Sequence, residues 1–264
     1  MINKRAVEHI KQYGTCHETG EQKRKILDEI GFPVGRPAEN VIIIGCFNAA
    51  GMPHVLRDLK NVLDALKVSY TLLEKEYCCG WATIGRPAVM AKDDEDILAF
   101  HSISRDFVVE NFRQARALGA KTIALFCSAC EPTYTNYADL TELEVISCID
   151  LIDRNFKGGK LDAEVDYYAG CYRFRRKVTD KSIDLKSAPR VLSKIEGLKV
   201  NNLQNKYCCY IPLHLEELIS TIKSNSIVTI CAGCYHNIED KIDRNRHQIK
   251  MLPEIVWESM QEKS

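Results

Sequence analysis

Cys208-Cys209, followed by Cys231-Ala232-Gly233-Cys234, is the stretch that decides the fold, because an earlier part of the chain repeats it. The earlier copy is Cys78-Cys79 followed by Cys127-Ser128-Ala129-Cys130. One further cysteine precedes each copy at the end of an apolar run, Cys46 in the first and Cys171 in the second. Ten of the 12 cysteines therefore form two five-membered sets in the same order, which indicates an internal duplication.

Length, charge and hydropathy limit the class of protein. The 264 residues suffice for two domains of ordinary size, and the formal net charge of +0 argues against broad electrostatic binding to nucleic acid or anionic lipid. No apolar run approaches the ~18 residues that span a bilayer, and the charged N-terminus is unlike a signal peptide. We therefore expect a cytoplasmic protein with no membrane span and no nucleic-acid partner.

This location determines how the cysteines are interpreted. Disulfides are uncommon in a reducing cytosol, so 12 cysteines are expected to be metal ligands or redox groups. A disulfide framework is the alternative, and it does occur in intracellular proteins of hyperthermophiles.

Alternating strand and helix patterns predict the α/β class. Short β-branched runs predict parallel strands over residues 41–45, 69–73, 122–126, 144–146, 165–169, 198–203 and 227–230. Helical periodicity is found over residues 1–31, 54–67, 93–118, 213–223 and 235–247. We expect two tandem, pseudo-repeated Rossmann-like domains with parallel sheets, at residues 40–159 and 160–264, after an N-terminal helical arm and linker at 1–39.

The predicted strands bring the cysteines of each set together. Ligands of an open parallel sheet gather outside the carboxyl ends of its strands, which is where both sets are expected to lie. Five thiolates with no obligatory histidine favour an iron–sulfur centre, because structural zinc and an ordinary cubane cluster each take four ligands. Adjacent side chains of an extended segment point apart, so each vicinal pair suits a polynuclear centre. Zinc in one or both sites is the alternative.

Two cysteines fall outside the sets. The two halves align so that Cys148 corresponds to Leu252, which predicts an apolar site for this thiol. Cys16, beside His17, has no counterpart in the other half. Its segment is interpreted as a surface arm or partner contact, or alternatively as the source of one extra ligand, and Cys16 is not included in the predicted ligand set.

The ordered sets, with Tyr77-Cys78-Cys79-Gly80-Trp81 and Cys231-Ala232-Gly233-Cys234-Tyr235-His236, resemble the CCG-domain (cysteine-rich) family, which includes the B-type subunit of heterodisulfide reductase. The resemblance covers roughly residues 40–264 and implies two CCG domains. It also implies two noncubane [4Fe-4S] clusters. The implied ligands are Cys46, Cys78, Cys79, Cys127 and Cys130 for one cluster, and Cys171, Cys208, Cys209, Cys231 and Cys234 for the other.

The resemblance further implies an activity and partners. The chain is expected to be the catalytic oxidoreductase subunit of a complex that reduces, or forms, a disulfide such as CoM-S-S-CoB. The ferredoxin-like module of longer relatives has no counterpart in this sequence, so a ferredoxin-like iron–sulfur subunit of the C-subunit type and a flavin-containing subunit are the implied partners. A small disulfide or thiol is the implied substrate. The alternative is a non-catalytic electron-transfer or docking subunit.

This sequence departs from the family near the second set. The second pair is followed by Tyr210 instead of glycine, and 21 residues separate Cys209 from Cys231 where 47 separate Cys79 from Cys127. A more open second site or an altered cluster is therefore expected.

Two further features of the second half carry polar groups close to its cysteines. His236 is the candidate catalytic proton donor, because the pKa of histidine suits proton transfer, and a surface role or a hydrogen bond to the cluster is the alternative. Arg173, Arg175 and Arg176 are candidates for contact with an anionic substrate or partner, although a solvated basic face is the ordinary interpretation.

Overall fold

The computed structural model describes residues 2–16, 18–170, 178–181 and 184–261. The chain forms two compact units. The first comprises Met1–Leu56, Val68–Cys148 and Phe174–Ile183, and the second comprises Arg57–Lys67, Ile149–Arg173 and Asp184–Ser264. The sequence-based division into residues 1–39, 40–159 and 160–264 stays a prediction.

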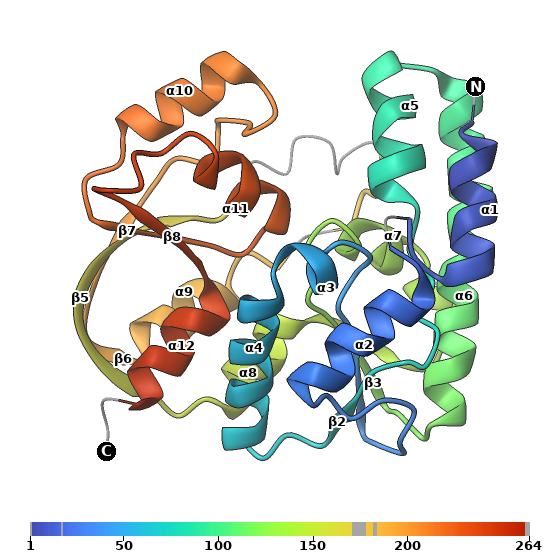
Figure 1. Cartoon of the computed structure of the whole chain (residues 1–264), viewed down its shortest axis with the longest axis horizontal. Coiled ribbons are helices and arrows are strands. Elements are labelled where there is room, and N and C mark those ends of the chain that lie inside the picture. The colour runs from blue at the N-terminus through green and yellow to red at the C-terminus, as the bar shows by residue number, and fades with distance from the viewer. Residues whose placement is uncertain (1, 17, 171–177, 182–183, 262–264) are drawn as a thin grey trace. The chain divides into compact units, whose positions relative to one another are not determined.

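The first unit is built on a four-stranded parallel sheet of order β2-β1-β3-β4. Figure 1 labels β2 and β3 of this sheet. Its strands are β1 (Asn40–Ile43), β2 (Tyr70–Thr71), β3 (Thr122–Leu125) and β4 (Glu144–Ser147). All four residues of β3 are buried, and three of them are apolar, as expected of a central parallel strand.

The second unit repeats this arrangement with the order β6-β5-β7-β8, again fully parallel. Its strands are β5 (Gly159–Tyr168), β6 (Ile195–Asn202), β7 (Ser226–Thr229) and β8 (Gln248–Met251). In both sheets the first strand of the half lies between the second and the third. The α/β class with two Rossmann-like repeats is therefore confirmed.

Helices and short helical turns connect the strands of the first sheet, and one further helix follows its last strand. They are α3 (Asn48–Gly51), α4 (Pro53–Ala65), the π-helical turn η1 (Trp81–Gly85), α5 (Arg86–Ala91), α6 (Asp94–Ala117), α7 (Glu131–Asn136), the 3₁₀ turn η2 (Ala138–Leu140) and α8 (Cys148–Asn155). The division between the two units falls within α4 and at the start of α8. Val108, Phe112 and Ala115 of α6 pack with Ile123 and Leu125 of β3 in the core.

The second unit has α9 (Ser187–Ser193), α10 (Pro212–Ser220), α11 (Ala232–Glu239) and α12 (Leu252–Gln261). Between Cys209 and Cys231 lies α10, whereas η1, α5 and α6 lie between Cys79 and Cys127. The helix expected over 235–247 instead begins at Ala232 and ends at Glu239. Among the described residues, no helix combines the length and apolar character needed to cross a bilayer.

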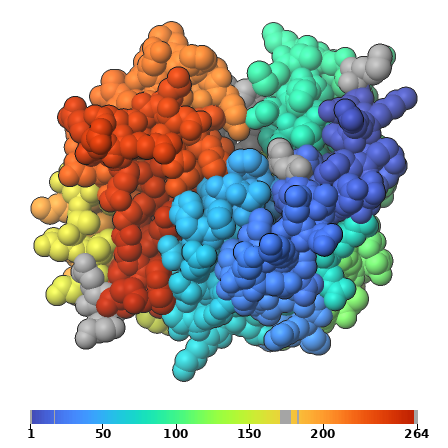
Figure 2. All heavy atoms as spheres, viewed as in Figure 1, coloured from blue at the N-terminus to red at the C-terminus, as the bar shows by residue number. Residues whose placement is uncertain are grey.

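The N-terminal arm is two helices, α1 (Lys4–Tyr13) and α2 (Gly20–Ile30), and not one helical stretch over 1–31. Gly14 ends α1 in the left-handed conformation, and Thr19 with Gln22 forms a capping box that begins α2. In Figure 2 both helices, in dark blue, lie at the surface of the first unit. The loop between them carries Cys16.

Candidate metal centre

Three thiols meet beyond the carboxyl end of β1. The sulfur of Cys16 lies 3.2 Å from that of Cys46 and 3.9 Å from that of Cys78. The three sulfur atoms all lie within 4.8 Å of one another, with Cys46 and Cys78 buried and Cys16 partly buried. Two of them belong to the predicted first set, and Cys16 joins them from the arm.

The remaining thiols of the first set continue this group through the vicinal pair. Cys79 follows Cys78 directly, and its sulfur lies 3.4 Å from that of Cys130. Cys130 in turn has a side-chain hydrogen bond with Cys127. The structure therefore places the five predicted thiols of the first half in two adjoining groups, which the vicinal pair joins, with Cys16 as a sixth member of the site.

Helix α6 fixes the backbone of the vicinal pair. The side-chain amide of Asn111 accepts a hydrogen bond from Tyr77 N and donates one to Tyr77 O, while Ser104 Oγ donates to Cys79 O. Gly80 follows with φ +77, and the chain then enters η1. Single π turns of this kind are frequently found at functional sites.

Glycine allows β1 and β3 to deliver their cysteines to the same place. Gly45 has φ +86, and a Cβ there would lie 2.6 Å from Cys127 Cβ and 2.9 Å from its sulfur. Any larger residue at position 45 would therefore displace Cys127. Close approach of this kind is a physical reason for glycine at this strand end.

The thiols share charge unequally, because several neighbouring sulfur atoms cannot all ionise without a cation. Hydrogen bonds with Cys46 and Cys78 lower the pKa of Cys16 to about 4. A hydrogen bond with Cys130 lowers the pKa of Cys79 well below its ordinary value. Hydrogen bonds to Cys16 and to Cys127 raise the pKa values of Cys78 and Cys130, respectively. A bound cation would relieve this conflict.

The second half repeats part of the cluster. The sulfur of Cys209 lies 3.5 Å from that of Cys234, which also has a side-chain hydrogen bond with Cys231. Cys208, next to Cys209, is fully buried. Cys171 lies outside the described residues, as do Arg173, Arg175 and Arg176. Four of the five predicted thiols of this set are thus described, and they lie beyond the carboxyl ends of β6 and β7.

Polar groups of α10 and α11 contact this second set. Cys208 N donates to His214 Nδ1 at 3.3 Å, and Asn237 Nδ2 donates to the sulfur of Cys209 at 3.4 Å. Tyr210 lies against the C-x-x-C turn, since a Cβ at Gly233 would lie 2.7 Å from the Tyr210 hydroxyl. The tyrosine in place of the family glycine therefore occupies space beside this turn.

His236 lies on α11, two residues after Cys234. It is about three-quarters buried, its Nδ1 is 4.0 Å from Glu239 Oε2, and its ring packs edge-on against Tyr235. These ring contacts are with residues of its own helix, and its catalytic role stays a prediction. Cys148, the first residue of α8, is buried, and burial raises its pKa to about 12. The apolar site predicted for Cys148 is confirmed.

Two contributors to these sites lie outside the predicted ligand sets. The sequence indicates Cys16 only as a possible extra ligand, because no nearby second ligand accompanies it. Asn237 carries no motif, although its position three residues after Cys234 puts both on one side of α11. That spacing is the signal from which Asn237 could have been found.

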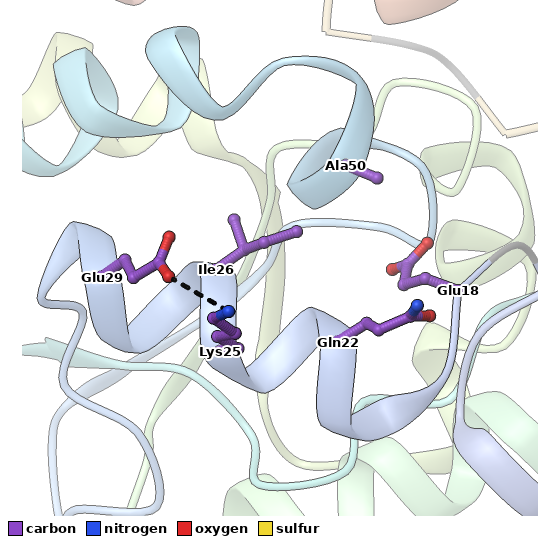
Figure 3. Close-up of a pocket in the computed structure, with 6 residues that line it drawn as sticks. All are labelled: Glu18, Gln22, Lys25, Ile26, Glu29 and Ala50. Atoms are coloured by element: carbon purple, nitrogen blue, oxygen red, sulfur yellow. Dashed lines mark ion pairs between the residues drawn. The ribbon is translucent and has the colours of Figure 1, made fainter.

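The described part of the first unit also has an open hollow of about 370 Å³ between α2 and α3. Figure 3 shows its lining residues, which are Glu18, Gln22, Lys25, Ile26, Glu29 and Ala50. Lys25 and Glu29 form an exposed ion pair across one turn of α2. None of these lining residues is a cysteine, so this hollow is separate from the sulfur clusters.

The donor set of the first cluster fits a thiolate-ligated metal group. Its six members are soft thiol donors, which select iron–sulfur clusters, zinc or copper(I) over hard cations. The buried hydroxyl of Thr133 lies beside Cys79, whose pKa it helps to lower, and no neighbouring oxygen or nitrogen among the described residues accepts its proton. A hydroxyl donor in this position fits an anionic sulfur centre.

Comparison with known proteins finds a family match within the first half of the chain. Residues 41–133 match the family model of the cysteine-rich CCG domain, and the match includes Cys46, Cys78, Cys79, Cys127 and Cys130. No curated protein matches the sequence. Among solved structures, the chain is similar to an aspartate racemase homologue from Pyrococcus horikoshii, with 12% identity and a TM-score of 0.34 over 85% of this chain and 98% of that one. A similarity this weak carries no functional information.

Proposed function

We propose that this chain, which carries a cysteine-rich CCG domain at residues 41–133, is an iron–sulfur oxidoreductase subunit of the heterodisulfide-reductase type. The observation that carries the proposal is the vicinal pair Cys78-Cys79. Cys78 contacts the Cys16 and Cys46 thiols, while Cys79 contacts Cys130. One pair therefore joins two groups of sulfur atoms, as a polynuclear centre requires and a single tetrahedral ion does not.

The two five-cysteine sets are the proposed ligands of two noncubane [4Fe-4S] clusters. Such clusters supply single electrons to a substrate. The chain supplies thiolates, burial and hydrogen bonds to sulfur, which together set the reduction potential. Asn237 donates to Cys209 in the second site, and Thr133 lies beside Cys79 in the first.

A small disulfide, or the thiols formed from it, is the proposed substrate. Cys127 and Cys231, the first residues of the two C-x-x-C turns, are partly exposed, whereas Cys130 and Cys234 are buried. Each sulfur cluster can therefore be approached from the side of its C-x-x-C turn. His236 is proposed to give a proton to the departing thiolate at the second site, because it lies on the same helix as Cys234.

We propose a ferredoxin-like iron–sulfur subunit and a flavin-containing subunit as partners that deliver or accept the electrons. The whole is proposed to act in the cytoplasm as the catalytic part of a complex.

Anaerobic purification with counts of iron and acid-labile sulfide tests the proposal, together with EPR spectra recorded with and without a small disulfide. Iron well above the ~4 atoms of one cubane, with a signal that the disulfide alters, is expected. Iron with no response to disulfide would favour an electron relay over direct disulfide chemistry. Zinc without iron would overturn the redox proposal.

Cysteine variants test whether the predicted ligands hold the iron. Cys79→Ser is expected to lose much of the iron of the first centre, because Cys79 joins its two groups of thiols. Cys148→Ser is the matched control, since this cysteine is equally buried but lies outside both sets, and it is expected to keep the full iron content.

A further inference from the structure

We propose that Cys16 is a further thiolate ligand of the first centre, so that six cysteines and not five hold it. The proposal rests on the proposed function, because it assumes that the first set binds an iron–sulfur cluster. The inference goes beyond the proposed function because it assigns a ligand from the N-terminal arm, outside the residues that match the family model.

The geometry places the Cys16 sulfur among the predicted ligands. It lies 3.2 Å from Cys46 Sγ and 3.9 Å from Cys78 Sγ, comparable with the 3.4 Å between Cys79 and Cys130. A separation of 3.2 Å is far longer than the ~2.05 Å of a disulfide, and no disulfide joins the described cysteines. Three thiols at these distances can bind a common metal group.

The loop that carries Cys16 is fixed on the Cys78 segment. Gly14 O accepts a hydrogen bond from Cys78 N at 2.7 Å, and a Cβ at Gly14 would lie 2.6 Å from Glu76 O. On the other side of Gly14, Thr15 is fully buried, its Oγ1 donates to Glu18 O, and its carbonyl contacts His9 Nδ1. The sulfur of Cys16 is therefore held in place by backbone contacts that precede and follow it.

Helix α2 anchors the same loop from its other end. Lys23 is buried, pairs with Glu76 at 3.3 Å and donates to Gly45 O at 3.3 Å. Glu76 accepts hydrogen bonds from Ile44 N and Gly45 N, directly before Cys46. The arm is thus bonded to both segments that supply the neighbouring thiols, as preorganisation of a ligand requires.

A sixth thiolate has chemical consequences. With a cluster bound, a further thiolate would compete with an exogenous sulfur ligand for the metal and would add negative charge to the centre. Greater negative charge lowers the reduction potential of an iron–sulfur cluster. The first centre would then suit electron transfer more than substrate binding.

Alkylation of the unaltered protein tests the contact without a variant. The tryptic peptide of residues 12–23 contains Cys16 as its single cysteine, so its modification by iodoacetamide can be followed by mass spectrometry. We expect Cys16 to react in the metal-free protein and to be at least tenfold slower in the iron-loaded protein. Equal rates in the two forms would overturn the proposal.

The variant Cys16→Ala, made in a Cys209→Ser/Cys234→Ser background, isolates the first centre. The variant is expected to lose iron to a chelator at least ~10-fold faster than its parent, since even indirect partners of metal ligands change affinity 10–100-fold. Its reduction potential is expected to rise and its EPR signal to change. Cys148→Ala in the same background is the control and is expected to match the parent.

The outcomes separate the two proposals. An iron-loaded parent with an unchanged potential, EPR signal and chelation rate in Cys16→Ala overturns the sixth ligand alone. Unaltered protein that binds no iron overturns the proposed function and this inference together. Far-UV circular dichroism of the variant shows whether it has folded, and if it has not, the alkylation rates of the unaltered protein decide.

Discussion

The Lys23 ammonium lies 3.3 Å from the Glu76 carboxylate, and both side chains are more than nine-tenths buried. Removing one partner of a buried pair leaves the other charge uncompensated, which typically costs about 3–5 kcal/mol. Lys23→Met is therefore expected to lower the free energy of unfolding by several kcal/mol in urea titrations. Lys25→Met is the control on the same helix, because its pair with Glu29 is exposed and such pairs contribute about 0–1 kcal/mol. Equal losses would contradict this prediction.

The same pair predicts a dependence on alkaline pH. Burial favours neutral Lys23, but attraction to Glu76 and Cys46 outweighs it, so the pKa of Lys23 is raised above its ordinary value. A raised pKa stabilises the folded state fully below the unfolded pKa, and this contribution is lost as pH rises through the folded pKa. Unfolding titrations carried from about pH 9 to above about pH 11 should show a decline that begins near the unfolded pKa of about 10.4 and that Lys23→Met lacks. Parallel curves would contradict the assignment.

Substitution of Gly14 is expected to disturb the loop that carries Cys16 more than the rest of the fold. Its φ is +78, and a Cβ would meet Glu76 O, so Gly14→Ala should cost more than the ~1 kcal/mol of left-handed strain and displace Cys16. Gly119→Ala is the matched control, since Gly119 has φ +75 with nothing within 4 Å of its Cβ position. Differential scanning calorimetry and iodoacetamide labelling of Cys16 measure both effects. Identical behaviour of the two variants would argue against tight docking of the loop.

Asn237 is expected to tune the second centre. Its amide donates to Cys209 Sγ, and such a bond stabilises the more negative, reduced state. Asn237→Ala should lower the reduction potential by tens of mV, on the scale where ~59 mV corresponds to tenfold for one electron. Asn245→Ala, at an exposed position, is the control in an EPR-monitored redox titration. A potential unchanged in both variants would remove Asn237 from the site.

His236 gives the remaining prediction. If its imidazole gives a proton to the departing thiolate, His236→Gln should reduce the rate of disulfide reduction by about 10²–10⁴-fold with the iron content unchanged. His54→Gln, an exposed position in the other unit, is expected to retain activity. A full rate in His236→Gln, measured by thiol release, would leave the histidine without a catalytic role.

The sequence is sufficient to predict the layers and the convergence of cysteines, because buried parallel strands are short apolar runs. The run at 41–45 predicts β1 to within a residue at its start. Residues 165–169 predict the buried end of β5 but not residues 159–164, where polar and apolar side chains alternate and several are exposed. A register shift between Lys160 and Ala163 further obscures the pattern there.

The contribution of Cys16 could not be predicted in the same way. Its position depends on the hydrogen bond between Gly14 O and Cys78 N and on the buried Lys23, which are contacts between segments distant in sequence. Helical periodicity describes α1 and α2 as amphipathic but does not indicate which surface they cover. A lysine within a helix is ordinarily exposed, so the burial of Lys23 has no signal in the sequence.

The matching strand orders of the two sheets pair each strand end of one half with a strand end of the other. Cys148 begins α8 directly after β4, and Leu252 begins α12 directly after β8. Cys148 and Leu252 thus occupy equivalent positions in the two halves. At the neighbouring strand ends that the structure describes, both halves have cysteine. After the fourth strand of each sheet the residue is buried by packing, and a thiol fills that place as well as a leucine side chain does. The exchange of Cys148 for Leu252 therefore marks where the repeated fold needs an apolar group and not a ligand.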